Sequence, residues 1–275
     1  MTRWLLDGEE AGAIDPDDRG LAYGDGLFET IAWRDGAPRL LERHLARLAD
    51  GCRRLALPPP DPRVLAAQLA GLGSGVACGT VKIIVTRGSG PRGYAPPPAA
   101  TPRLLVGFSA AIGTAAVGRG ARALTCSVPA SENRALGGIK TLNRLDNVLA
   151  QAEVARRGAA EGIMLGHDGR LVGGTRANLF LVRNRVLFTP AVDSAGVAGV
   201  MRGLVLEIAA RHDIPAQVGR GSPQDLAQAE EIFLTSSLVG IRAVQCMDGR
   251  ELALGPLTQR LTAALAAAGV VEPVS

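Results

Sequence analysis

The spacing of apolar residues predicts a chain in which helices and strands both occur. Residues 38–56 carry leucines at helical spacing, which predicts an amphipathic helix. Residues 80–86 alternate and are rich in β-branched side chains, which predicts a strand. The same criteria predict further helices over residues 61–72, 142–157, 200–211 and 256–268. Further strands are expected over residues 1–7, 27–33, 103–109, 121–129, 162–166, 177–182, 186–189 and 231–236.

The order of these elements predicts an α+β fold with two domains. Strands outnumber what regular βαβ alternation would require, and 275 residues exceed the usual size of one domain, about 150 residues. Residues 110–120 are small and weakly patterned, so we place a linker there, between a small α/β domain at 1–109 and a larger domain at 121–275. The glycine-rich segment 87–102 is expected to be a loop free to close over a ligand.

The amino-acid composition of the chain excludes several classes of function. Apolar residues make up 47% of the chain, enough for a packed core, and the net charge is only +4. Aromatic residues make up 3%, too few for a base-stacking surface, so no nucleic-acid partner is expected. The small positive excess fits an anionic small-molecule substrate. No apolar run approaches the ~20 residues of a membrane span, and no signal peptide or CxxC pair is evident, so we expect a cytoplasmic protein that does not bind membranes.

The scarcity of lysine identifies the candidate nucleophile. Only two of the 30 basic residues are lysines, Lys82 and Lys140, and the three histidines lack metal-ligand spacing, so no metal site is predicted. Lys140 follows two glycines and precedes a predicted helix, a setting that suits an amine forming a Schiff base. A surface lysine beside a helix is the alternative. Lys82 lies in an alternating strand, where we expect it to face solvent.

Two further segments could bind an anion. Residues 196–202 lead directly into a predicted helix, whose first N–H groups and dipole favour a phosphate. Residues 235–237 place hydroxyl groups at the end of a predicted strand. Each signal is weak alone, because many helices and strands begin or end in this way.

Five motifs follow one another along the chain: DRGLAYGDGLFET (residues 18–30), HLARL (44–48), KTLNRL (140–145), NLF (178–180) and GVAGVMR (196–202). Together they make the chain resemble the fold-type IV pyridoxal-phosphate enzymes, the class IV aminotransferase family. The family includes branched-chain and D-amino-acid aminotransferases and aminodeoxychorismate lyases, and the segments 86–94 and 138–146 are most similar to the lyases. The resemblance implies a homodimer with pyridoxal 5′-phosphate that converts 4-amino-4-deoxychorismate to 4-aminobenzoate and pyruvate, in folate biosynthesis.

The resemblance also implies roles for single residues. Lys140 matches the lysine that binds the cofactor aldehyde and carries the proton, and Arg47 matches the arginine that binds the cofactor phosphate. Without the family, a solvated helix arginine would be the better interpretation of Arg47. Further matches to the phosphate site are Gly199, Val200, Met201, Ser236 and Ser237. In the glycine-rich loop the candidates for the substrate carboxylates are Arg87, Arg92 and, more weakly, Tyr94, because guanidinium groups pair with carboxylates; an exposed basic loop is the alternative.

One position departs from the family. A glutamate that pairs with the pyridine nitrogen is expected five residues before Asn178, where this chain has Gly173. The absence of this carboxylate allows three outcomes. The reaction is slower, or water or a hydroxyl (Thr175 or Ser236) replaces the carboxylate at the pyridine nitrogen, or the chain performs a reaction that needs less electron withdrawal by the ring. Three functions therefore stay open: the lyase, an aminotransferase of the D-amino-acid or branched-chain type, and a cofactor-binding protein with little catalysis.

Overall fold

The computed structural model describes residues 2–111 and 120–270, and the chain divides into two compact units. Unit 1 comprises residues 1–114 and 139–143, and unit 2 comprises residues 115–138 and 144–275. The α+β fold class is confirmed. The division near residue 114 falls inside the expected linker 110–120, most of which lies outside the described residues. The return of residues 139–143 to unit 1 was not predicted, because the whole segment 121–275 was assigned to the second domain.

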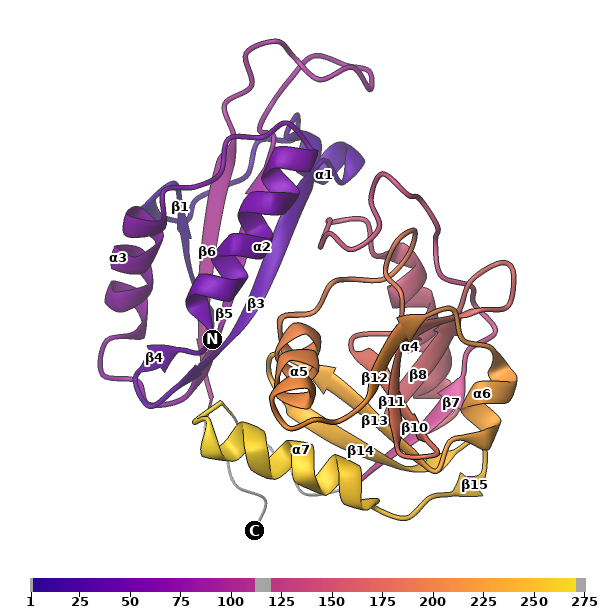
Figure 1. Cartoon of the computed structure of the whole chain (residues 1–275). Helices are drawn as coiled ribbons and strands as arrows, with labels where there is room; N and C mark the ends of the chain where they lie inside the picture. Colours follow the sequence, from indigo (N-terminus) through magenta and orange to yellow (C-terminus); the bar gives the residue numbers. More distant parts are fainter. Residues whose placement is uncertain (1, 112–119, 271–275) are drawn as a thin grey trace. The chain divides into compact units, whose positions relative to one another are not determined.

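Unit 1 is built on an antiparallel sheet whose order, within the described residues, is β2-β1-β6-β5-β3-β4. Side chains alternate along β3, so Leu27 and Trp33 are buried on one face while Phe28 and Thr30 are half-buried on the other. Helices α2 and α3 cover the first face (Figure 1). The strands are β1 (Thr2–Leu6), β2 (Glu9–Glu10), β3 (Gly26–Arg34), β4 (Ala37–Pro38), β5 (Gly79–Thr86) and β6 (Arg103–Ala110), and the helices are α1 (Arg19–Tyr23), α2 (Leu41–Arg54) and α3 (Pro62–Gly73).

The helices approach this sheet closely because glycines face it. A Cβ added at Gly51 of α2 would lie 2.9 Å from the Leu27 side chain, and one added at Gly73 of α3 would lie 2.3 Å from the Trp33 ring. Both contacts are shorter than van der Waals packing allows, so only glycine permits this spacing. The helix predicted over 38–56 is therefore confirmed as α2, with the contact surface that its leucine pattern indicated.

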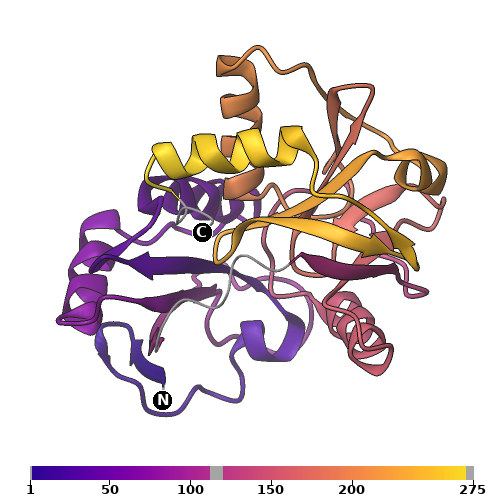
Figure 2. The ribbon, with the colours of Figure 1, turned by 90° about the horizontal axis from the view of Figure 1, so that it is seen from below.

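Unit 2 is built on a mixed sheet whose order, within the described residues, is β12-β11-β10-β13-β14-β7-β8-β9, with β15 paired to β14. Helices α5 and α7 pack against each other and against β13 (Figure 2). The strands are β7 (Ala121–Thr125), β8 (Glu161–Leu165), β9 (Leu171–Gly174), β10 (Asn178–Arg183), β11 (Val186–Pro190), β12 (Ala216–Gly219), β13 (Glu231–Ser236), β14 (Gly240–Met247) and β15 (Arg250–Glu251). The helices are α4 (Leu145–Arg156), α5 (Val200–Arg211), α6 (Pro223–Gln228) and α7 (Pro256–Ala267).

The core of unit 2 lies along β10 and β13. The rings of Phe180 and Phe233 stack with centroids 4.9 Å apart, and both side chains are fully buried. Strands β9 and β14 were not predicted, although β14 lies between β13 and β7. Within the described residues, no helix combines the length and apolarity that crossing a bilayer would require.

Candidate active site

The lysine segment is held along an edge of β3 in unit 1. The Phe28 N–H donates to the Lys140 carbonyl at 3.0 Å, and the Leu142 N–H donates to the Gly26 carbonyl at 3.0 Å. These bonds form a bridge between Leu27 and Thr141, where β4 does not reach. The backbone on both sides of Lys140 is therefore fixed, which gives its long side chain a defined starting point.

Both lysines of the chain place their amines on the ring of Phe28. The Lys140 Nζ lies 4.2 Å from the ring centroid, and the Lys82 Nζ lies 3.7 Å from it. Lys82 is half-buried, so the expectation that it simply faces solvent is wrong: Phe28, Thr30 and Lys82 share the face of the sheet opposite α2. Burial lowers the pKa of Lys82, and the nearby charge of Glu29 partly opposes this shift.

A buried carboxylate positions Arg47. Glu29 is 1% exposed, and its Oε1 accepts from the Arg47 Nε at 2.8 Å while its Oε2 accepts from the Arg47 Nη2 at 2.5 Å. His44, one turn earlier on α2, contacts the same Oε2 through its Nδ1 at 2.7 Å. Burial would raise the pKa of Glu29, but hydrogen bonds and charge from His44 and Arg47 hold it below its ordinary value. Arg47 is thus held rigidly, unlike a solvated helix arginine.

Replacing Glu29 with glutamine is expected to destabilise the protein by about 3 kcal/mol at neutral pH, because the half-buried guanidinium of Arg47 loses its charged partner. The folded-state pKa is lowered, so the carboxylate stabilises the fold above its unfolded-state pKa and loses this effect as the pH falls through its folded-state pKa. Urea unfolding should therefore show a wild-type advantage that shrinks with acidification. Glu42→Gln, an exposed change on the same helix, is the control. A constant difference between wild type and Glu29→Gln across acidic and neutral pH would contradict this pairing.

Arg87 is engaged inside unit 1. It is 7% exposed, and its guanidinium donates to both carboxylate oxygens of Asp25 at 2.7 and 3.0 Å and to the carbonyls of Leu55 and Ala56. Burial would raise the pKa of Asp25, but hydrogen bonds and charge from Arg87 and Arg19 keep it lowered. These contacts support a structural role for Arg87, and its proposed role with substrate carboxylates stays a prediction without support from the geometry.

The rest of the glycine-rich loop is tied to Arg19. This buried arginine donates to the carbonyls of Gly93 and Tyr94 at 2.8 and 2.7 Å, and also pairs with Asp25. The Tyr94 ring is 86% exposed and meets the Tyr23 ring edge to face, while Arg92 is exposed. The loop is thus anchored at its centre, and of the three substrate candidates Arg92 and Tyr94 keep side chains at the surface.

In unit 2, the turn before α5 has the geometry of an anion site. Gly199 is the N-cap residue of α5, and within the described residues no side chain caps this helix. A Cβ on Gly199 would lie 1.9 Å from the Asn178 Oδ1, so only glycine fits there. Asn178 in turn donates through its Nδ2 to the Val197 carbonyl at 2.8 Å. The first amides of α5, those of Val200 and Met201, therefore lie at a helix N-terminus whose dipole favours an anion.

Hydroxyl groups lie on the strand beside this turn. Thr235 pairs with Asn178 across β13 and β10, and its side chain is 2% exposed. Its Oγ1 is buried and has no hydrogen-bond partner within the described structure. Ser236 and Ser237 follow at the end of β13 and are half-buried. A buried hydroxyl without a partner is costly, so this position suits a ligand that supplies an acceptor.

Gly173 lies on β9 opposite Met164, and its surroundings leave space. A Cβ there would meet only the Ala177 carbonyl oxygen, at 3.4 Å, which is tight but close to ordinary contact. The buried carboxylate of Glu161 accepts the Thr175 hydroxyl, and Gln151 contacts the same hydroxyl. Thr175 is therefore engaged with Glu161, which weakens its case as a substitute for the missing glutamate.

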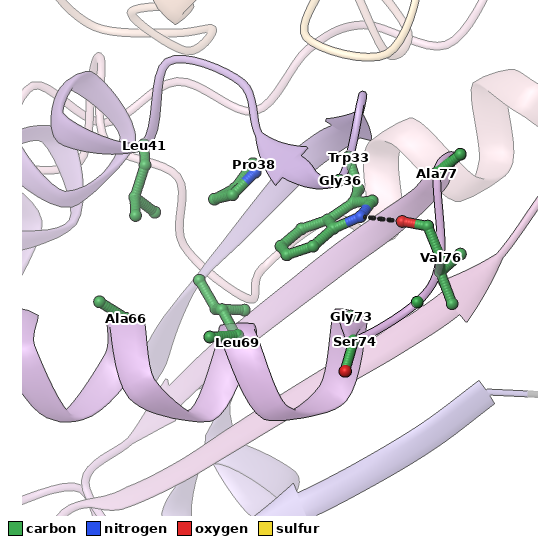
Figure 3. Close-up of a pocket in the computed structure, with 12 residues that line it drawn as sticks. Trp33, Gly36, Pro38, Leu41, Ala66, Leu69, Gly73, Ser74, Val76 and Ala77 are labelled. Atoms are coloured by element: carbon green, nitrogen blue, oxygen red, sulfur yellow. Dashed lines mark hydrogen bonds between the residues drawn. The ribbon is translucent and has the colours of Figure 1, made fainter.

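A separate pocket in unit 1 contains none of the predicted site residues. It has a volume of about 560 Å³ and lies between α3 and the β3–β4 hairpin, with Leu41, Leu69 and Pro38 among its walls (Figure 3). The Trp33 Nε1 donates to the Val76 carbonyl at 2.7 Å at its edge. We assign it no part in the chemistry. The described residues contain no group of three or more His, Cys, Asp or Glu side chains placed to hold a metal ion.

Several positioning residues were missed in the sequence, although the motifs contained them. Glu29 and Asp25 lie in DRGLAYGDGLFET, and His44 lies in HLARL. Glu29 pairs with His44 and Arg47, 15 and 18 residues away in sequence, and Asp25 pairs with Arg87, 62 residues away. The motif residues were visible, but spacing alone does not reveal pairings over such separations.

Comparison with known proteins identifies the same family as the motifs. The family model described as amino-transferase class IV matches residues 26–246. An aminodeoxychorismate lyase of Vibrio harveyi is 33% identical over 89% of this chain and 92% of its own length. A putative branched-chain-amino-acid aminotransferase of Methanocaldococcus jannaschii is 32% identical over 89% of this chain and 87% of its own length.

Solved structures give the same architecture. The 4-amino-4-deoxychorismate lyase of Pseudomonas aeruginosa superimposes with a TM-score of 0.89 and 44% identity, covering 96% of this chain and 98% of that one. A hypothetical aminotransferase of Mycobacterium tuberculosis in its PLP-bound form superimposes with a TM-score of 0.82 and 25% identity, covering 98% and 99%. The expected two-domain fold-type IV architecture is thereby confirmed.

Proposed function

The chain belongs to the class IV aminotransferase family of pyridoxal-phosphate enzymes, and we propose that it is an aminodeoxychorismate lyase. The observation that carries this proposal is the 44% identity, over 96% of the chain, to the lyase of Pseudomonas aeruginosa. The substrate would be 4-amino-4-deoxychorismate, and the products would be 4-aminobenzoate and pyruvate. The carboxylates of this substrate fit the small positive net charge of the chain.

The residues present fit the phosphate of the cofactor. The N-terminus of α5 would supply the amides of Val200 and Met201, and the hydroxyls of Thr235, Ser236 and Ser237 would supply further donors, that of Thr235 having no partner within the described residues. The resemblance also assigns a phosphate contact to Arg47, whose guanidinium Glu29 holds within unit 1. When bound, pyridoxal 5′-phosphate supplies an aldehyde that reacts with amines and a ring that withdraws electrons.

Lys140 would perform two tasks in this reaction. In the resting enzyme, the Lys140 amine would bind the cofactor aldehyde. Once the substrate amine had displaced it, the Lys140 Nζ would accept a proton from the substrate carbon. The bridge between Leu27 and Thr141 fixes the backbone from which this side chain extends. Elimination of pyruvate then leaves an aromatic ring, which provides a strong driving force.

Product analysis separates the lyase from the aminotransferase, the second candidate, favoured by the 32% identity to the Methanocaldococcus protein. Purified protein incubated with 4-amino-4-deoxychorismate should release 4-aminobenzoate and pyruvate without any keto acid. Amino-group transfer from D-alanine or a branched-chain amino acid, dependent on added keto acid and without 4-aminobenzoate release, would overturn the lyase proposal. A protein that binds the cofactor and shows neither activity would also contradict the lyase proposal and would support a cofactor-binding role with little catalysis.

The outer face of α4 supports a homodimer. Leu145, Val148 and Leu149 lie at i, i+3 and i+4 and are 71%, 59% and 52% exposed, while the opposite face of the helix buries Ala150 and Val154. Contiguous exposed apolar side chains are a feature of protein–protein interfaces. A second copy packed antiparallel about a two-fold axis through this stripe would place apolar side chains against apolar side chains, so we propose a second copy of this chain as the partner.

Val148→Glu should convert the dimer to a monomer, because it places two charges in an apolar two-fold contact. Light scattering after size exclusion should show half the wild-type mass. Val64→Glu is the matched control, since Val64 is also an exposed helix valine, on α3. A wild-type monomer, or a Val148→Glu variant that stays dimeric, would contradict this interface.

A further inference from the structure

The amines of Lys82 and Lys140 both contact the ring of Phe28. The Nζ atoms of Lys82 and Lys140 lie 3.7 and 4.2 Å from the centroid of Phe28, all within unit 1. The ring attracts each cation through its face, while the two positive charges repel each other. On a half-buried face this repulsion is less screened than in water, so the proton affinities of the two amines are coupled.

The neighbours of Lys82 do little to neutralise it. Strands β3 and β6 flank β5, and the residues opposite Lys82 are Thr30 and Gly107, neither of which is charged. Glu29, next to Thr30 on β3, is the carboxylate whose charge acts on Lys82. Both oxygens of Glu29 accept hydrogen bonds from Arg47, and one also contacts His44, so its charge is already shared.

We propose that Lys82 is a positioning residue for Lys140: its charge, held on the same Phe28 ring, keeps the Lys140 amine uncharged and nucleophilic over more of the neutral pH range. A lysine must lose its proton before it can attack an aldehyde, and a cationic neighbour favours that loss. The meaning of this inference for catalysis rests on the proposed role of Lys140. The electrostatic coupling itself does not, because it concerns two side chains of the free protein.

The test uses the fact that the chain has only two lysines. Acetic anhydride modifies an amine only in its uncharged form, so trace labelling across a pH series, read by mass spectrometry of the two lysine peptides, gives the pKa of each. We expect Lys82→Met to raise the pKa of Lys140 by about one unit, which reduces its labelling near neutral pH about tenfold. Lys82→Arg keeps the charge and should leave the Lys140 profile close to wild type.

Arg63→Met is the matched control, because it removes one positive charge from an exposed position on α3. Coincident Lys140 profiles in wild type and Lys82→Met would overturn the inference, as would an equal shift in Arg63→Met or in Lys82→Arg. Circular dichroism of each variant establishes that the fold is retained.

A second arm separates this inference from the proposed function. Preincubation with pyridoxal 5′-phosphate should protect Lys140, and not Lys82, from acetylation if Lys140 binds the cofactor. Loss of that protection would overturn the cofactor role while the pH profiles still decide the coupling. In the cofactor-loaded protein, the pH at which the visible band shifts should also rise by about one unit in Lys82→Met.

Discussion

Replacing Lys140 with alanine is expected to reduce turnover by at least a thousandfold and to remove the visible absorption of the bound cofactor. The loss follows because the chain then has no amine on the bridge to β3, where residues 139–143 hold Lys140, the proposed nucleophile. The remaining lysine, Lys82, begins from the middle of β5 and cannot take over that backbone position. Formation of 4-aminobenzoate by absorbance or fluorescence measures the effect.

Lys82→Met is the control for this experiment, since it removes the other lysine and leaves Lys140 in place. We expect it to retain the visible cofactor band. A Lys140→Ala variant that keeps both the band and substantial turnover would show that the chemistry lies elsewhere.

Restoring an acid at position 173 is expected to increase turnover by roughly tenfold to hundredfold, the equivalent of about 1.5–3 kcal/mol for a charge-assisted hydrogen bond. The resemblance implies a glutamate there that keeps the pyridine nitrogen protonated. The structure has room for the beginning of such a side chain, because a Cβ on Gly173 would meet only the Ala177 carbonyl oxygen, at 3.4 Å. Steady-state kinetics of Gly173→Glu against wild type measures the change.

Gly173→Gln is the matched variant, with nearly the same shape and no charge. An increase in Gly173→Glu that Gly173→Gln does not share would support the electrostatic explanation. Equal or lower turnover in Gly173→Glu would mean that this chain performs its reaction without a carboxylate at that nitrogen.

The sequence predicted the elements that depend on local pattern. The leucine spacing of α2 and the alternation of β5 were sufficient, because each element buries one regular face. Strand β14 was missed because Arg242 and Gln245 interrupt its apolar residues, and only its position between β13 and β7 makes it a strand. Short β9 ends in two glycines, which local propensity assigns to a turn.

Site residues that lie in a recognisable motif could be predicted from the sequence. Residues whose role depends on an ion pair with a distant residue could not. Lys140 stands out because lysine is rare in this chain, and residues 196–202 stand out because they precede a helix. Arg87 was expected to meet a substrate, but Asp25, distant in sequence, holds its guanidinium. Lys82 was assigned to solvent because alternation shows which side of a strand a residue takes, but not what covers that side.

Borohydride reduction of the purified protein with its cofactor, followed by peptide mass spectrometry, tests the proposed covalent role of Lys140 most directly. Reduction should fix the pyridoxyl group on the peptide that contains Lys140 and leave the Lys82 peptide unmodified. A pyridoxyl group on Lys82, or a colourless protein in which neither lysine is modified, would contradict the proposal.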